Sequence, residues 1–152
     1  AAEQLAAGHT VALITLGDAT VYSTYLYVHE RIKRLGFETR IVNGIPSFCA
    51  AAARLDMPLV NGSQKLHILP ASYHIEEALE LPGVKVLMKS GRQMPKVKAL
   101  LKEKGLEARM VENCGMEGEK TYQSLEEIPD DAGYFSLLIA ESSEEKQGGQ
   151  RT

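Results

Sequence analysis

Hydrophobic positions near the start of the chain form a short apolar run followed by a helical stripe. Val11–Leu16 is apolar except for Thr15, which is typical of a buried strand, and Gly17 and Asp18 end it. From about Thr20 to Leu35, apolar residues recur at helical spacing, which predicts a helix with one face towards a sheet: Val21, Tyr25, Val28, Ile32 and Leu35. Phe37–Val42 is predicted as the next strand. The short links predict a right-handed parallel βαβ unit.

The sequence from Asn43 onwards predicts a further helix and then a change of domain. Ser47, which follows Pro46, is a suitable N-cap, and the alanines after it favour a helix. These alanines leave a smooth helix face, which suits either close packing on a sheet or contact with a flat ligand. Loop-forming residues between positions 55 and 64 predict a boundary. We therefore expect two α/β domains, residues 1–60 and 61–152.

The second predicted domain alternates strands and helices. We expect strands at 65–69, 84–88, 108–112 and 134–140, helices at 72–81 and 95–104, and a helical turn at 124–128. From about residue 141 the chain is polar and glycine-rich, which is typical of a mobile tail. Ala1–Ala7 resembles the last turns of a helix that ends at Gly8. Such a beginning suggests a fragment whose first domain is incomplete.

Composition and charge narrow the possible functions. The 152 residues are 44% hydrophobic and 24% charged, as in ordinary globular proteins, and the net charge of -3 gives no indication of nucleic-acid binding. No apolar run reaches the roughly 18 residues of a membrane span, and no signal-peptide pattern is present. Cys49 and Cys114 lack metal-site and disulfide spacing, which is typical of reduced thiols in a cytoplasmic protein. His67 and His74 fit no common ligand spacing, so we expect no metal site.

The turn after Val11–Leu16 is the first candidate ligand site, because ligands bind at the carboxyl ends of strands in open α/β sheets. Gly17 lets a ligand approach the backbone, and Asp18 either offers a carboxylate or caps the next helix. The chain has no glycine-rich dinucleotide or nucleoside-triphosphate loop and no Gly-x-Ser-x-Gly elbow. Cys114 is conceivable as a thiol nucleophile, but no partner stands near it in the sequence.

Four segments resemble the tetrapyrrole methyltransferases in order and spacing, and the resemblance spans about Gly8 to Ala140: Leu16–Ser23, Asn43–Ala53, Val86–Met88 and Val111–Gly115. The chain is most similar to members that methylate carbon 20 of a reduced tetrapyrrole, a match carried by residues 44–51 and 112–122. The resemblance implies two α/β domains with S-adenosylmethionine in the cleft between them and S-adenosylhomocysteine as product. It also implies a cytoplasmic homodimer.

Carried onto this sequence, the resemblance implies a set of cofactor-binding residues: Leu16, Gly17, Asp18, Val21, Pro46, Ser47, Met88 and Cys114. It assigns no catalytic base. Lys89 and Arg92 are candidates for binding the tetrapyrrole carboxylates, or else they are charges on a solvated loop.

Three departures from the family pattern bear on these expectations. Ala19 stands where many relatives have proline, and Cys114 where many have glycine, so the contact of Cys114 would be through its backbone. The family's first strand and its Pro-Gly-Asp loop are missing. Two alternatives therefore stay open, a sibling enzyme that methylates another ring carbon and a non-catalytic structural fragment. Whether the substrate carries cobalt is also open.

Overall fold

The computed structural model describes residues 1–71 and 75–142, and the chain divides into two compact units, Ala1–Ser47 and Phe48–Thr152. This division falls at the beginning of helix α3 (Ser47–Arg54). The expected domain boundary lies near residue 60, in the loop that follows α3. The division of the intact fold into domains 1–60 and 61–152 stays a prediction.

The first unit contains two helices, α1 (Ala2–Ala6) and α2 (Tyr25–Arg34). Helix α1 ends at Ala6 with Ala7 as its C-cap, and Gly8 has φ +83°, which confirms the predicted helix end at this glycine. Helix α2 ends where the pattern predicts but begins five residues later than expected at Thr20. The preceding turn explains the delay, because Tyr22 has φ +48° and a left-handed residue cannot belong to a right-handed helix.

The two strands predicted in the first unit are wrong as predictions of this structure. Residues 11–16 and 37–42 are irregular, and no strand forms within the described residues 1–47, so the expected parallel βαβ unit is absent there. The apolar side chains of these segments are exposed, with Ile14 at 93% and Val42 at 76%. A strand exists only with a paired neighbour. The two segments therefore have the apolar pattern of strands but have no neighbouring strand within the first unit to pair with.

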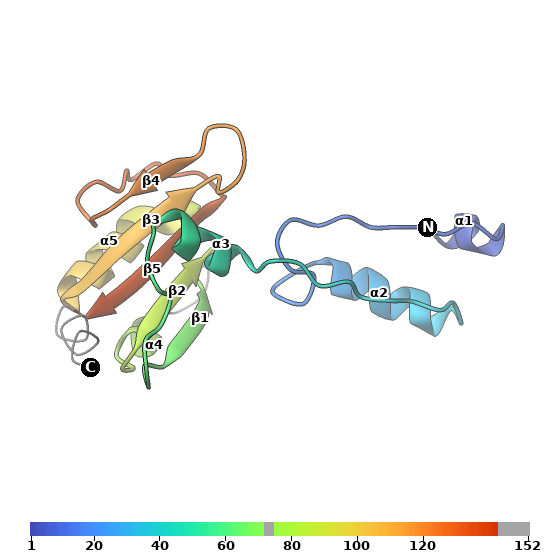
Figure 1. Ribbon diagram of the computed structural model, residues 1–152, viewed down its shortest axis with the longest axis horizontal. Coiled ribbons are helices and arrows are strands. Elements are labelled where there is room, and N and C mark those ends of the chain that lie inside the picture. The colour runs from blue at the N-terminus through green and yellow to red at the C-terminus, as the bar shows by residue number, and fades with distance from the viewer. Residues whose placement is uncertain (72–74, 143–152) are drawn as a thin grey trace. The chain divides into compact units, whose positions relative to one another are not determined.

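The second unit is built on a five-stranded mixed sheet (Figure 1). Its strands are β1 (Leu66–Pro70), β2 (Val84–Met88), β3 (Leu106–Glu112), β4 (Lys120–Tyr122) and β5 (Ser136–Ser142). The spatial order is β1-β2-β5-β3-β4, in which only β1 and β2 run parallel. An α/β fold is thus confirmed for this unit, with an antiparallel half that the sequence pattern did not indicate.

Helices cover both faces of this sheet. Helix α5 (Met94–Glu103) and the short α4 (Glu76–Leu79) pack on one face, where the main core gathers side chains of alternate strand positions, among them Leu87, Met110 and Leu138. The intervening positions Val86, Val111 and Ile139 point to the opposite face of the sheet. They are buried too, so that face is also covered. Figure 1 shows α3 on that face, and its Ala51, Ala52 and Leu55 are buried.

Most of the strands and helices predicted for the second unit are confirmed, and a few differ. Strands β1, β2, β3 and β5 and helix α5 are confirmed to within two residues at most ends, whereas β4 was not predicted and residues 124–128 form a turn without a helix. Part of the helix predicted at 72–81 lies outside the described residues, and α4 is its described part. The predicted tail lies outside them from residue 143 onwards.

Close helix–sheet packing accounts for the alanines of α3. Ala51 is completely buried and Ala53, on the same helix, is exposed. We therefore expect Ala51→Leu to lower the free energy of unfolding by about 1–3 kcal/mol, because added methylenes overfill a packed interface. Ala53→Leu is the matched control and should change it by less than about 0.5 kcal/mol. Urea unfolding followed by circular dichroism measures both, and equal effects would contradict tight packing at Ala51.

Candidate cofactor site

Asp18 is the best-connected side chain of the first unit. Its Oδ1 accepts hydrogen bonds from the backbone N–H of Thr20 at 2.8 Å and from the Thr20 hydroxyl at 2.5 Å. Its Oδ2 accepts a hydrogen bond from the backbone N–H of Gly44 at 3.0 Å. As a whole residue, Asp18 is only 8% exposed. It therefore both closes its own turn and joins that turn to a segment 26 residues further along the chain.

The two glycines of these segments lie in direct contact. Gly17 has φ +75°, and a Cβ placed on it would lie 3.7 Å from the backbone nitrogen of Ser47. A Cβ placed on Gly44 would collide with the carbonyl oxygen of Gly17. The turns at Gly17 and at residues 44–47 are therefore neighbours within the first unit, although the strands predicted to precede them are absent there.

The other predicted cofactor residues of the first unit lie close in sequence to Gly17 and Gly44, and they differ in exposure. Leu16 is 68% exposed, and Val21 is half-buried, with its N–H donating to the carbonyl of Asp18 at 3.3 Å. Pro46 and Ser47 are half-buried, and Ser47 is the first residue of α3. Backbone atoms therefore dominate this half of the predicted site, with Leu16 as an apolar side chain open to contact.

The hydrogen bonds to Asp18 predict a pH-dependent turn. The Thr20 hydroxyl, the Thr20 N–H and the Gly44 N–H each lower the pKa of Asp18 below its ordinary value, because they stabilise the charged form. The stabilisation is complete above the ordinary aspartate pKa of about 3.9 and is lost as the pH falls through the lower folded value. We expect the amide resonances of Thr20 and Gly44 to titrate together, with a midpoint below about 3.9. Separate midpoints would contradict a shared carboxylate.

In the second unit, Met88 and Cys114 reach the same end of the sheet. Met88 is the last residue of β2 and pairs with Leu137 of β5, which on its other side pairs with Val111 of β3. Cys114 follows the end of β3 by two residues. The structure therefore brings together these two predicted cofactor residues, which are far apart in sequence.

Left-handed backbone marks both chain segments at this end. Lys89, directly after β2, has φ +61°, and Asn113, directly after β3, has φ +52°. Tyr22, which follows Val21 in the first unit, is also left-handed. Such conformations are costly for residues other than glycine and concentrate at functional sites. Three of the four left-handed non-glycine residues of the described chain thus adjoin predicted cofactor residues; the fourth is Asp56.

The environment of Cys114 does not favour thiolate chemistry. Burial raises the pKa of its thiol, the charge of Glu119 raises it further, and Arg54 partly opposes these effects. A neutral thiol is a poor nucleophile. Cys114 thus suits a contact made through its backbone better than a catalytic role.

The predicted basic candidates also lie at this end of the sheet. Lys89 is half-buried, and Arg92, in the short 3-10 helix η1 (Gly91–Gln93), is exposed. Both follow β2 within four residues. His67 lies elsewhere and has its Nε2 at 2.9 Å from the Pro82 carbonyl oxygen, while His74 lies outside the described residues. Within residues 1–71 and 75–142, no cluster of three or more His, Cys, Asp or Glu side chains could hold a metal ion.

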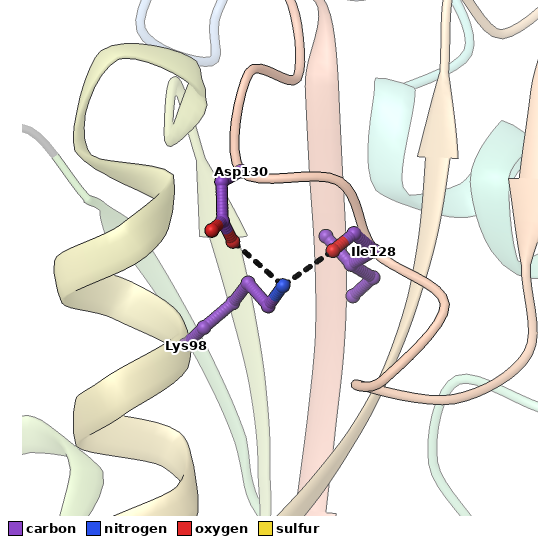
Figure 2. Close-up of polar contacts among 3 residues, drawn as sticks. All are labelled: Lys98, Ile128 and Asp130. Atoms are coloured by element: carbon purple, nitrogen blue, oxygen red, sulfur yellow. Dashed lines mark hydrogen bonds and ion pairs between the residues drawn. The ribbon is translucent and has the colours of Figure 1, made fainter.

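The sequence pattern did not indicate the loop that supports this end of the sheet, residues 128–135. Glu112 accepts a hydrogen bond from the Gly133 N–H at 2.6 Å and a weaker one from the Tyr122 hydroxyl at 3.4 Å. Figure 2 shows Lys98 of α5 between the Ile128 carbonyl oxygen at 2.5 Å and the Asp130 carboxylate at 2.7 Å. The available signal was Glu112 itself, which lies inside the Val111–Gly115 motif.

A hollow of about 400 Å³ opens elsewhere on the second unit. Its lining includes Met57, Arg109 and Gln123, and it lies at the opposite end of β3 from Cys114. None of the predicted cofactor residues lines it. Because none of those residues contributes to its lining, we do not assign the cofactor to it. None of the described helices is long and apolar enough to span a bilayer.

Comparison with known proteins places these residues in a family. Residues 1–129 match the family model described as Tetrapyrrole (Corrin/Porphyrin) Methylases. The chain is 38% identical over 132 residues to a probable cobalt-precorrin-2 C(20)-methyltransferase of Methanocaldococcus jannaschii, covering 85% of this chain and 57% of that protein. It is 36% identical over 143 residues to the cobalt-precorrin-2 C(20)-methyltransferase of Salmonella typhimurium, covering 90% and 60%. The chain therefore spans about three fifths of the length of these relatives.

Solved structures agree in fold. The X-ray structure of a cobalt precorrin-4 methyltransferase has a TM-score of 0.78 at 17% identity and covers 92% of this chain and 67% of that one. A uroporphyrin-III C-methyl transferase from Thermus thermophilus, complexed with S-adenosyl homocysteine, has a TM-score of 0.64 at 16% identity, with 82% and 62% covered. At these identities the likeness shows the α/β fold alone. The family model and the curated relatives carry the assignment, and the chain belongs to the tetrapyrrole (corrin/porphyrin) methylases.

Proposed function

We propose that the intact protein transfers a methyl group from S-adenosylmethionine to carbon 20 of precorrin-2, or of its cobalt form, in cobalamin biosynthesis. The observation that carries this proposal is the identity of 38% to a probable cobalt-precorrin-2 C(20)-methyltransferase within a matched family. A sibling activity on another ring carbon and a non-catalytic fragment are the alternatives.

The proposed methyl transfer requires few catalytic side chains. S-adenosylmethionine supplies an electrophilic sulfonium methyl group. The protein has to hold this group in line with the nucleophilic carbon and exclude water. A site built mainly from backbone and apolar atoms suits that task, and the proton that later leaves carbon 20 has no assigned base.

We assign cofactor binding to the residues predicted from the sequence: Leu16, Gly17, Asp18, Val21, Pro46, Ser47, Met88 and Cys114. Gly17 and Gly44 have no side chains to cover the backbone where they meet, which supports a contact of the cofactor with backbone atoms there. Leu16 offers an exposed apolar side chain, and the thiol of Cys114 carries no charge to interfere. Lys89 and Arg92 would bind carboxylates of the tetrapyrrole.

The decisive experiment is turnover by the intact enzyme. Purified protein is incubated with methyl-labelled S-adenosylmethionine and precorrin-2 or cobalt-precorrin-2, and the product is analysed by mass spectrometry and NMR. We expect one labelled methyl group on carbon 20. A label on another carbon would establish the sibling activity, and no transfer to either substrate would overturn the proposal.

We further propose that the intact protein is a cytoplasmic homodimer, and we expect the 152-residue chain by itself to self-associate. Its first unit exposes apolar side chains that water disfavours, including Ile14 at 93% and Leu16 at 68%. Light scattering should show species larger than a monomer, and Ile14→Lys should reduce them. A monodisperse monomer with normal cofactor binding would contradict this expectation.

A further inference from the structure

We propose that Glu119 is a positioning residue, which holds the loop of Cys114 in its cofactor-binding shape by joining it to helix α3. The loop comprises residues 113–119, between β3 and β4, and is called the Cys114 loop below. This inference rests on the proposed function, because it assigns a role in binding S-adenosylmethionine. It concerns Glu119 and Arg54, neither of which belongs to the predicted site.

Both carboxylate oxygens of Glu119 are engaged. Oε2 accepts a hydrogen bond from the backbone N–H of Gly115 at 2.6 Å. Oε1 forms an ion pair with Nε of Arg54, the last residue of α3, at 2.7 Å. One side chain therefore connects the residue next to Cys114 with the helix that packs on the sheet.

The Cys114 loop needs such support because its own backbone is strained. Asn113, Gly115 and Gly118 are all left-handed, and for the asparagine this conformation has a steric cost. Within the loop, the N–H of Met116 donates to the carbonyl of Asn113 at 2.9 Å, and that of Glu119 to Met116 at 3.3 Å. The side chain of Glu119, the last residue of the loop, closes this series of turns by accepting from the Gly115 N–H.

The contact is suited to local positioning more than to global stability. The Arg54 side chain is 54% exposed and that of Glu119 is 21% exposed, and exposed ion pairs stabilise folded proteins little. The short hydrogen bond from an N–H to a carboxylate is the stronger interaction, and it acts on the backbone between Cys114 and Gly115. Loss of Glu119 should therefore disturb the loop while the unit stays folded.

Cys114 provides a native reporter of the loop. Its alkylation by iodoacetamide can be followed by peptide mass spectrometry, with the exposed Cys49 as an internal reference. We expect Glu119→Gln and Arg54→Ala to accelerate alkylation of Cys114 about five- to tenfold, the factor that corresponds to losing one charge-assisted hydrogen bond. Glu117→Gln, at an exposed position of the same loop, is the matched control and should leave the rate unchanged.

Arg54→Ala separates loop opening from electrostatics. Arg54 lowers the pKa of Cys114, so its removal alone would make the thiol less reactive and slow its alkylation. Opening of the loop predicts the opposite sign. Slower alkylation in Arg54→Ala, or an unchanged rate in Glu119→Gln, would overturn the proposal.

The role in cofactor binding is tested on the intact enzyme by calorimetry and steady-state kinetics with S-adenosylmethionine. We expect Glu119→Gln to raise Kd and KM for the cofactor about five- to tenfold with kcat largely retained, since a residue that positions the cofactor-binding loop acts on binding and not on the chemical step. Equal affinity of Glu119→Gln and the wild type would overturn this inference alone. A wild-type enzyme that does not bind S-adenosylmethionine would overturn the proposed function, and this inference with it.

Discussion

Replacing Gly91 with alanine is expected to lower the free energy of unfolding of the second unit by about 1–3 kcal/mol or more. A Cβ at Gly91 would collide with the carbonyl oxygen of Gly133 and lie 2.9 Å from that of Ala132. Both obstacles are backbone atoms, so neither can swing aside as a side chain would. Gly91 does not have a left-handed φ, and the penalty is therefore steric. Urea unfolding followed by circular dichroism measures it.

Gly133→Ala is the matched control for this prediction. A Cβ there would lie 2.8 Å from Oε1 of Glu112, which is the far end of a flexible side chain. Rotation of that side chain relieves the contact, so Gly133→Ala should cost less than Gly91→Ala. Equal losses, or a Gly91→Ala variant of wild-type stability, would show that the loop at 128–135 can move away from η1. The end of β2 that carries Met88 would then be less rigid than its contacts indicate.

Replacing Asp18 with asparagine in the intact enzyme is expected to weaken S-adenosylmethionine binding about tenfold or more, with the fold unchanged. The three groups that contact the carboxylate all serve as donors in this structure. The amide of asparagine has one accepting oxygen and one donating NH2 group, so it cannot accept at both sides. The turn at Gly17 would then lose either its own closure or its connection to Gly44.

Calorimetry gives the affinity, and circular dichroism shows whether the fold is intact. Glu38→Gln, an exposed acidic position in the same unit, is the control and should bind the cofactor like the wild type. If Asp18→Asn binds the cofactor with equal affinity, Asp18 serves only to cap and join the turns. The difference in cofactor affinity between the wild type and Asp18→Asn should also disappear at low pH, because protonation of Asp18 in the wild type then removes the same interactions.

Several elements followed from local sequence alone. The apolar run of β2, the periodicity and Pro95 of α5, and the loop-forming residues between α3 and β1 each reflect short-range preferences that packing reinforced. The family was also visible in four separated motifs, because chemistry constrains residue types at a site more than it constrains the rest of the chain. Asp18 was expected either to offer a carboxylate or to cap the next helix, and its contacts show another use, because it closes its own turn and joins that turn to Gly44.

Tertiary structure alone decided the rest. Residues 11–16 have the apolar pattern of a strand, yet strand formation requires hydrogen bonds to a neighbour that the pattern does not specify. The order β1-β2-β5-β3-β4 and the pairing of the unpredicted β4 also depend on contacts between distant residues. The same holds for the contacts of Glu112 with Gly133 and of Glu119 with Arg54 and Gly115. The local sequence therefore determined which segments could form strands and helices. Contacts with residues remote in sequence determined which strands pair and which backbone segments the polar side chains connect.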